Sequence, residues 1–344
     1  MLYQYFLKPL LFLLQPETAH HLVMRILALI CKFEAGQLWI KSMAGAWIPQ
    51  EEVHTMGIHF KNRIGLAAGF DKDGRYLDTL RHLGFGFIEI GTVTPKPQAG
   101  NDTPRLFRLP KDEALINRMG FNNDGVDALC SRLASFEKGD LIIGGNIGKN
   151  KVTPNEDAAN DYLYCFEKLY PYVDYFVINI SSPNTPGLRE LQEREPLKKL
   201  LDLISEANAN KVVPKPLLLK IAPDLHQDQI TEICHLLLEA NWAGIITANT
   251  TLDRSMLKTA KAQLDSIGAG GLSGRPLLEK ANFALTSAKK AFGSAPMCII
   301  GVGGIHSGKD AAEKINIGAD LIQVYTGFVY EGPKLIRDIK ETIR

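Results

Sequence analysis

The sequence has few cysteines and no paired ones, and this limits the kinds of site that it can build. Five cysteines are scattered over 344 residues, and no two of them form a Cys-x-x-Cys pair. An odd number of separated thiols is typical of a reducing compartment and argues against zinc and iron-sulfur ligation. We therefore expect the cysteines to be small core residues, and we expect no metal site.

A charge excess of one sign and a long apolar run are also missing. The 39 basic and 38 acidic side chains leave a formal net charge of +1, and no basic run replaces the missing field. Nucleic-acid-binding proteins need such a field, so no nucleic-acid partner is expected. No stretch approaches the roughly 20 apolar residues of a membrane-spanning helix, and the sequence predicts no bilayer crossing.

The N-terminus is dense in apolar residues, which are Leu2, Tyr3, Tyr5, Phe6, Leu7, Leu10, Leu11, Phe12, Leu13 and Leu14. A second segment carries apolar residues at helical spacing between Leu22 and Ile30. Together they predict two short amphipathic helices. Lys8, Pro9 and a poor cleavage site argue against a signal peptide, and the first residues are not Arg- and Ser-rich as in a mitochondrial presequence. Packing on the chain's own domain stays open, but the apolar excess favours helices that dip into one membrane leaflet.

The rest of the chain repeats a strand, a loop and a helix. After a small hairpin at 53–62, strand-like runs are expected at 64–67, 87–90, 141–146, 175–179, 217–221, 244–248, 298–302 and 321–325. Helical patterns fall at 73–83, 124–136, 156–169, 195–208, 228–240, 277–291, 308–317 and 333–343. Eight such units predict an α/β chain with a (β/α)8 barrel rather than an open doubly wound sheet. We assign 1–40 to a membrane-associating region and 41–344 to one catalytic barrel.

Chemistry in such barrels belongs to the loops that follow the strands. Long insertions at 91–140 and 250–276 are expected to form walls or lids there. Glycine-rich turns follow the seventh strand at 301–305 and the eighth at Tyr325-Thr326-Gly327, and 270–274 adds more backbone donors. This arrangement predicts a phosphorylated ligand. No Gly-x-Gly-x-x-Gly follows the first strand, which disfavours a Rossmann-type nicotinamide site.

Several polar residues stand at the expected strand ends. The stiff loop 180–187 follows strand four, and Asn117, Asn179, Asn184 and Asn249 lie at strand ends or in loops. Converging amides suit a planar ligand with several N–H and C=O groups, such as a pyrimidine. Lys220 ends strand five and needs a negative partner, for which a reduced flavin and a nearby carboxylate are both candidates. In the first loop, Asp71 and Asp73 are as well explained by helix capping as by ligand binding.

The chain resembles the class 2, quinone-dependent dihydroorotate dehydrogenases of pyrimidine biosynthesis over almost its whole length. The motifs that carry the resemblance lie at 65–74, 89–95, 105–109, 117–123, 146–150, 179–187, 220–224, 249–255, 270–276 and 301–305. The resemblance implies oxidation of dihydroorotate to orotate, FMN as the hydride acceptor, and ubiquinone or menaquinone as the final acceptor. It also implies a monomer. The apolar N-terminus without a mitochondrial presequence predicts peripheral attachment to the cytoplasmic side of a bacterial inner membrane.

Site residues follow from the same resemblance. Ser182 matches the catalytic base, where a cysteine would mark the soluble class 1 enzymes. The implied substrate residues are Lys72, Asn117, Arg118, Met119, Gly120, Phe121, Asn179, Asn184, Asn249 and Thr250. The implied FMN residues are Ala68, Gly69, Phe70, Asp71, Lys72, Thr92, Asn146, Asn179, Lys220, Ala248, Gly274, Gly303, Tyr325 and Thr326. His20 and Arg108 match positions of the quinone tunnel, although an ordinary surface histidine would explain His20 equally well.

The chain departs from the family pattern at Ala248, among other positions, and two alternative functions stay open. Family members commonly read Ala-Thr-Asn-Thr where this chain has Thr247-Ala248-Asn249-Thr250, so Ala248 would contact FMN only through its backbone. Another FMN-dependent barrel oxidoreductase, such as a class 1 dihydroorotate or a dihydropyrimidine dehydrogenase, is disfavoured by Ser182 and the apolar N-terminus. A membrane-attached binding protein that has lost catalysis is the second alternative.

Overall fold

Eight parallel strands close into a barrel. The computed structural model describes residues 3–343, so Met1, Leu2 and Arg344 lie outside the described residues. The strands are β3 (Ile64–Leu66), β4 (Phe87–Val93), β7 (Ile142–Ile147), β8 (Tyr175–Asn179), β9 (Leu217–Lys220), β10 (Gly244–Thr247), β12 (Cys298–Val302) and β13 (Leu321–Val324). They pair in this order, and β13 returns to β3. The predicted barrel is confirmed, and each strand lies within a residue or a few of its expected place.

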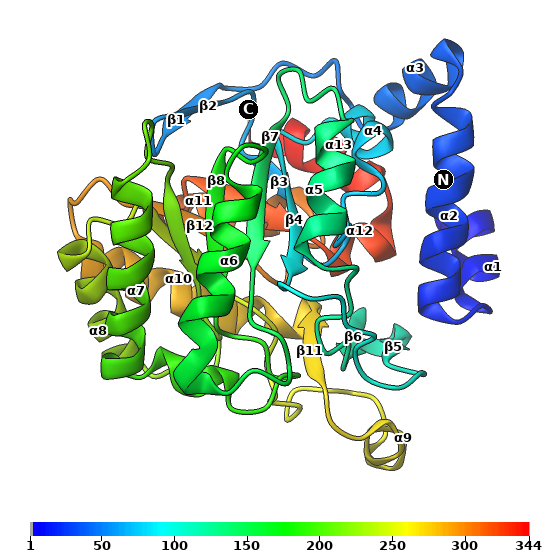
Figure 1. Cartoon of the computed structure of the whole chain (residues 1–344). Coiled ribbons are helices and arrows are strands. Elements are labelled where there is room, and N and C mark those ends of the chain that lie inside the picture. The colour runs from blue at the N-terminus through cyan, green and yellow to red at the C-terminus, as the bar shows by residue number, and fades with distance from the viewer. Residues whose placement is uncertain (1–2, 344) are drawn as a thin grey trace.

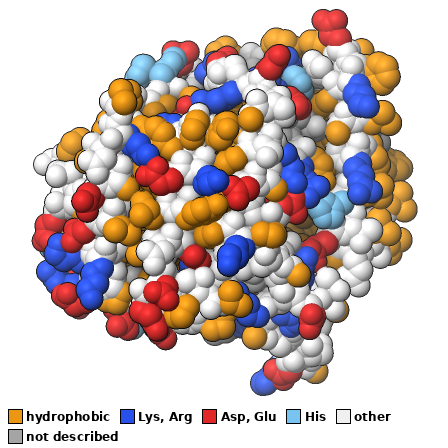
Figure 2. All heavy atoms as spheres, viewed as in Figure 1, with side chains coloured by type: hydrophobic (Ala, Val, Ile, Leu, Met, Phe, Trp, Pro, Cys, Tyr) orange, Lys and Arg blue, Asp and Glu red, His pale blue; other side chains and the backbone are white. Residues whose placement is uncertain are grey.

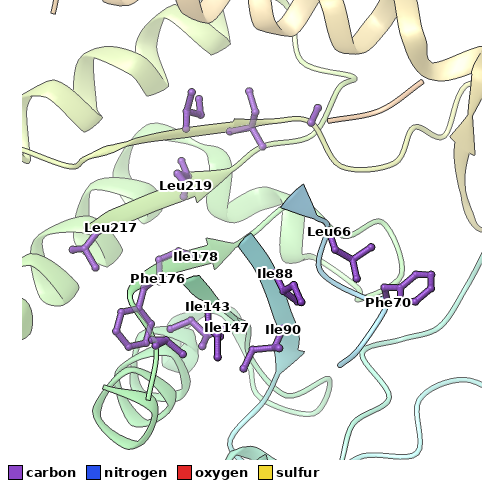
Figure 3. Packing of buried hydrophobic residues seen from close by; sticks show 14 of the residues in the cluster. Leu66, Phe70, Ile88, Ile90, Ile143, Ile147, Phe176, Ile178, Leu217 and Leu219 are labelled. Carbon is purple, nitrogen blue, oxygen red and sulfur yellow. The ribbon is translucent and has the colours of Figure 1, made fainter. Parts of the chain in front are cut away.

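Helices surround the barrel and cover its outer face (Figure 1). They are α4 (Leu77–Leu80), α5 (Val126–Ala134), α6 (Ala158–Leu169), α7 (Arg194–Ala209), α8 (Gln227–Glu239), α10 (Leu278–Phe292), α11 (Gly308–Ile317), α12 (Thr326–Glu331) and α13 (Lys334–Thr342). Their buried faces pack on every second residue of the strands, because successive strand side chains point to opposite faces. Figure 3 shows part of this layer, with Ile143, Ile178 and Leu219 from three neighbouring strands.

The intervening strand residues fill the inside of the barrel. Leu218, Val177 and Ile300 belong to this second cluster, and the hairpin of β1 (Val53–Thr55) and β2 (Ile58–Phe60) joins it. The ring of Phe60 meets that of Phe87 edge to face at 5.4 Å. The hairpin was expected at 53–62, and the structure shows that it closes the barrel at the end away from the catalytic loops.

The helix expected at 73–83 is shorter than the sequence pattern predicts. Its first residues form a turn in which the Asp71 carboxylate accepts hydrogen bonds from the Arg75 and Tyr76 N–H groups, each at 2.8 Å. Gly74 has a φ of +63°, a left-handed conformation that a helix cannot contain. Helix α4 therefore begins only at Leu77 and continues into a 3-10 turn, Arg81–Leu83.

The two long insertions fold together above one side of the barrel mouth. β5 (Leu106–Leu109) and β6 (Ala114–Asn117) come from the first insertion, and β11 (Gly271–Gly274) comes from the second. They form an antiparallel sheet in the order β11-β6-β5. Helix α9 (Lys261–Ile267) precedes β11 and lies at the edge of the molecule in Figure 1. The sequence predicted a wall here but not its strands.

The N-terminal extension lies beside the barrel as a helical unit (Figure 1). A π-helical turn (Tyr3–Leu7) and α1 (Lys8–Phe12) precede α2 (Pro16–Ile30) and α3 (Glu34–Met43). Large apolar side chains are exposed along it, and Figure 2 shows hydrophobic side chains gathered over this edge of the molecule. Within residues 3–343, no helix is long and apolar enough to cross a membrane. The assigned boundary at 40/41 falls inside α3 and stays a prediction.

Candidate active site

A cavity opens where the barrel strands end, beneath the three-stranded sheet. Most of the side chains expected in the site line it, together with several that were not expected. The predicted residues along the cavity are Ala68, Gly69, Lys72, Thr92, Asn117, Met119, Gly120, Phe121, Asn179, Ser182, Asn184, Lys220, Ala248, Asn249, Thr250, Gly274, Gly303, Tyr325 and Thr326. They come from seven of the eight strand ends and from both insertions, so the fold brings distant parts of the chain together.

Ser182 lies on the loop after β8 and is 6% exposed. The loop leaves the strand at Asn179, whose carbonyl oxygen accepts a 2.9 Å hydrogen bond from the buried Tyr162 hydroxyl. The Asn184 N–H donates to Ser182 Oγ at 3.3 Å. This bond leaves the Ser182 hydroxyl hydrogen and one lone pair free to turn toward a ligand in the cavity.

The four predicted asparagines meet in pairs around that loop. The Asn184 side-chain amide donates to Asn117 Oδ1 at 3.0 Å, which joins the loop to β6 of the overhanging sheet. The Asn249 amide donates to Ser181 Oγ at 3.0 Å and to Asn179 Oδ1 at 3.3 Å. Each amide is thus oriented by another one. Ser181 is fully buried in this network and helps to hold it in place.

Lys72 follows β3 and places a cation at the opposite side of the cavity. Its ammonium donates to Asn122 Oδ1. Burial lowers the pKa of Lys72 to about 8, although Glu17 acts in the opposite direction. The amine is therefore close to half-charged in mildly alkaline solution, and an anion beside it would favour the charged form.

Lys220 meets a carboxylate that the sequence analysis did not identify. Its ammonium lies 3.8 Å from Glu89 Oε1, and both side chains are buried. Glu89 also accepts hydrogen bonds from the Asn146 amide at 2.7 Å and from the Gln323 amide at 2.5 Å. On their strands, these side chains alternate in step with the residues that point into the barrel. They therefore form a polar layer directly above the apolar residues that fill the barrel interior. The only sign of it in the sequence is a lone glutamate in an otherwise apolar strand.

The far side of the cavity offers backbone donors. Among residues 3–343, the N–H groups of Gly303 and Gly304 have no hydrogen-bond acceptor. Gly274 has a φ of +104°, and a Cβ there would lie 2.4 Å from the Glu113 carbonyl oxygen. The hydroxyls of Ser273 and Thr326 lie 2.8 Å apart beside these turns. Free N–H groups and hydroxyls in one place are what a phosphate group requires.

Two more polar atoms at the cavity fit a flavin. The buried Thr250 Oγ1 and Gln323 Oε1 have no hydrogen-bond partner among the described residues. Thr92 Oγ1, at the end of β4, accepts from the Asn179 amide at 2.8 Å and donates to Asn146 Oδ1 at 2.5 Å. The donor set therefore combines unsatisfied amide and hydroxyl oxygens, a lysine and a phosphate cradle, which is the chemistry that FMN needs at its ring and its phosphate.

Some predicted site residues do not line the cavity, namely Phe70, Asp71, Arg118 and Asn146. Phe70 packs edge to face on Tyr325 and at a tilt on Phe328, and Asp71 binds the turn before α4. Burial raises the pKa of Asp71 to about 6.

Arg118 turns outward, where its guanidinium donates to the Ile267 carbonyl oxygen. Asn146 stands behind Thr92. These four side chains are placed to support the cavity wall, and their predicted ligand contacts stay untested.

His20 and Arg108, the predicted tunnel residues, both lie where the N-terminal helices meet the barrel. The His20 ring packs edge to face on Phe70 at 4.9 Å. Burial lowers the pKa of His20 to about 4, so this histidine is neutral at neutral pH. The Arg108 guanidinium donates to the Leu14 carbonyl oxygen at 2.7 Å and covers the Phe12 ring at 4.5 Å. Phe70 thus links His20 to Tyr325 at the cavity.

Comparison with known proteins finds similar sequences and structures over nearly the whole chain. The family model described as dihydroorotate dehydrogenase matches residues 51–344. A protein of Christiangramia forsetii named dihydroorotate dehydrogenase (quinone) is 50% identical over 346 residues, which cover 99% of this chain and 98% of the relative. One of the same name from Gloeobacter violaceus is 50% identical and covers 96% of this chain and 91% of the relative. A crystal structure of DHODH in complex with ferulenol from Eimeria tenella superposes with a TM-score of 0.81 at 34% identity and covers 95% of this chain and 90% of that one.

Proposed function

This chain belongs to the family of quinone-dependent dihydroorotate dehydrogenases, and we propose that it oxidises its substrate in the cavity at the mouth of the barrel. The family catalyses the oxidation of dihydroorotate to orotate in pyrimidine biosynthesis, with a quinone as electron acceptor. One observation supports this choice of cavity as the active site: Ser182 lines it together with four asparagines that orient one another.

The family uses FMN, and the residues of this chain suit that group. The phosphate would take the N–H groups of Gly303 and Gly304 and the hydroxyl of Thr326, with Gly274 leaving room for it. Ala68, Gly69, Ala248 and Thr92 would flank the ring, and Lys220 would face its negative side. When bound, FMN supplies the acceptor for the hydride that leaves C6 of dihydroorotate.

Ser182 removes the proton from C5 of the substrate. A serine is a weak base at neutral pH, so the surroundings have to favour the proton's departure. As Ser182 takes the proton from C5, its own hydroxyl proton passes through a polar relay to solvent, and the Asn184 N–H stabilises the negative charge that this departure leaves on Ser182 Oγ. Burial of Ser182 keeps bulk water away from the abstraction. The carbanion that forms at C5 is adjacent to a carbonyl, and its charge is shared with that carbonyl oxygen.

The remaining polar side chains hold and orient the substrate. Lys72 provides a positive charge for the carboxylate of dihydroorotate, while Asn117, Asn184 and Asn249 present oriented amides to its ring. Because these amides bind one another, they are already in position before the substrate arrives, which lowers the entropic cost of orienting it. Met119, Gly120 and Phe121 close the side of the cavity under the first insertion.

The second half-reaction belongs to the N-terminal extension. We infer that a quinone reaches the flavin between the extension and the barrel, past His20 and Arg108, and that the exposed apolar side chains of the extension dip into one membrane leaflet. Peripheral attachment to the cytoplasmic side of a bacterial inner membrane suits this route. A monomeric state rests on the family resemblance alone.

Substitution of Ser182 tests the assignment. With Ser182→Ala, bleaching of the flavin by dihydroorotate under anaerobic conditions should slow by at least about tenfold, since general base catalysis contributes about 10²–10⁴-fold. Ser182→Cys should retain part of the rate because a thiolate is also a base. Bleaching by the alanine variant at the wild-type rate would refute the role of Ser182.

A further inference from the structure

A second cavity lies at the opposite end of the barrel from the active site. This basal cavity has a volume of about 460 Å³ and is bordered by 46–50, 61–62, 84–86, 140–141, Arg81 and Lys340. These residues precede β3, β4 and β7, whose other ends lead to the active site, or belong to α13. Its rim includes Trp47, which is 66% exposed, so the cavity is reachable from solvent. Nothing in the proposed reaction uses this end of the barrel.

Lys340 is the unusual residue in its wall. The side chain is buried, with the residue 2% exposed, and no acceptor within residues 3–343 lies within hydrogen-bond or ion-pair distance of its ammonium. The Nζ atom lies against Gly84, where a Cβ would be only 2.7 Å away. The neighbouring amide of Gln50 donates to the Lys340 carbonyl oxygen at 2.9 Å and fixes the backbone.

Other buried lysines of this protein have acceptors. Lys314 is completely buried, and its ammonium donates to Asn282 Oδ1 at 2.7 Å. Lys149 donates to the Thr153 carbonyl oxygen at 2.7 Å. Burial alone lowers the pKa of Lys340 to about 8, and no acidic group counteracts this effect. The Lys340 ammonium therefore meets only the space of the basal cavity, and an anion bound there would stabilise its charged form.

The other charges of the basal cavity have the same sign. Lys61, Arg81 and Lys340 line it against a single acid, Asp140, so the wall has a surplus of two positive charges. Asp140 is already paired with Lys61. The Asn62 side chain is used as well, because it accepts from the Ile64 N–H at 3.0 Å and donates to the Gly84 carbonyl oxygen at 3.3 Å. The wall therefore lacks an acceptor for Lys340 and attracts an anion.

We propose that the basal cavity is a binding site for a phosphate group, with Lys340 as its central donor. A phosphate dianion matches the surplus of two positive charges, and its oxygens accept hydrogen bonds from ammonium and guanidinium groups. The phosphate can belong to a small soluble ester or to the headgroup of an anionic phospholipid. The exposed Trp47 at the rim, close in sequence to the apolar Leu38 and Trp39 of α3, suits the second source.

Calorimetric titration with inorganic phosphate tests the site. The flavin-containing enzyme is first saturated with orotate, so that Lys72 and the active site are blocked, and chloride at equal ionic strength is the reference. The wild-type protein should bind phosphate, and Lys340→Met should bind it at least about tenfold more weakly, since one charge-assisted hydrogen bond is lost. Lys61→Gln, at an exposed position, should weaken binding by a smaller factor.

A matched control and a lipid experiment separate the outcomes. Lys314→Met removes an equally buried lysine that does not line the cavity and should leave phosphate binding unchanged. Sedimentation with phosphatidylcholine vesicles, with and without phosphatidylglycerol, identifies the source of the phosphate. If phosphatidylglycerol increases vesicle binding and Lys340→Met abolishes this increase, the ligand is a lipid headgroup. If the protein binds free phosphate but phosphatidylglycerol does not increase vesicle binding, the ligand is a soluble ester. Wild-type protein that binds neither probe, or Lys340→Met protein that binds them as the wild type does, would overturn the proposal.

Discussion

The Glu89 carboxylate lies 3.8 Å from the Lys220 ammonium inside the barrel, and both side chains are shielded from solvent. They sit directly beneath the expected flavin site, so each should tune the bound cofactor with opposite sign. Glu89→Gln removes a negative charge and should raise the midpoint potential of the flavin, while Lys220→Met should lower it, each on the order of tens of millivolts. Potentiometric titration of the purified variants measures both shifts. Shifts of the same sign would contradict the pairing.

The same pair should also matter for stability. Removing one partner of a buried ion pair leaves the other charge uncompensated, which costs about 3–5 kcal/mol. Glu89→Gln should therefore lower the free energy of unfolding by about this amount, as measured by urea denaturation followed through circular dichroism. Replacing the exposed Glu52, which pairs with His59 at the surface, is the matched control and should cost less than about 1 kcal/mol. Equal losses for the two variants would mean that the buried pair has no special role.

Lys72 predicts how substrate capture depends on pH. The pKa of Lys72 in the folded protein is lowered to about 8. Its side chain is therefore positively charged below that pH and loses its charge as the pH rises through it. The anionic substrate needs the charged form, and kcat/KM for dihydroorotate should consequently fall above about pH 8. Steady-state rates from pH 6 to about 10, analysed as a pH profile, measure this, and Lys72→Met should remove the descending limb. A limb that persists in the variant would assign it to another group.

Arg108 should separate the two half-reactions. Its guanidinium fixes the N-terminal helices by binding the Leu14 carbonyl oxygen and covering Phe12. Arg108→Met keeps much of the apolar contact but loses the hydrogen bond to the Leu14 carbonyl oxygen. The rate of quinone reduction should therefore fall by about tenfold. Flavin reduction by dihydroorotate, measured by stopped flow without quinone, should stay unchanged. Equal slowing of both half-reactions would place Arg108 outside the quinone route.

Membrane attachment is testable at the exposed face of the extension. Leu13 is 82% exposed directly after α1, and Leu13→Asp should reduce cosedimentation with phospholipid vesicles several-fold. Val212, fully exposed at 101% on the loop after α7, provides the control, because Val212→Asp adds the same charge away from the extension. If Val212→Asp reduced binding as much as Leu13→Asp does, a general charge effect would explain both results.

The sequence was sufficient for the barrel because each strand is a short apolar run followed by a helical pattern, and the order of the strands in the barrel follows the chain. It was also sufficient for the residues that line the cavity, such as Ser182 and Asn117, since they stand in motifs at strand ends. Pairing across the fold was not predictable from pattern. Glu89 and Gln323 are 234 positions apart, and no local periodicity indicates that they share a hydrogen bond.

Local chemistry explains the remaining differences. The pattern at 73–83 is helical, but the Asp71 carboxylate and the left-handed Gly74 hold its first residues in a turn. The strands of the overhanging sheet are short and come from two insertions, so each lacks a signal of its own. Phe70 and Asn146 stand in the expected motifs, yet one packs beneath Tyr325 and the other behind Thr92. A motif gives a residue's position in the chain. The direction of its side chain depends on residues that are close in the fold but distant in the sequence.

Anaerobic bleaching of the flavin by dihydroorotate tests the central claim most directly. The purified protein should be yellow, and dihydroorotate should bleach its visible absorbance in the absence of oxygen, after which a ubiquinone or menaquinone analogue should restore the colour. The wild type should complete both steps, and Ser182→Ala should bleach at least about tenfold more slowly. A protein that stays yellow with dihydroorotate, or one that a quinone cannot reoxidise, would contradict the account.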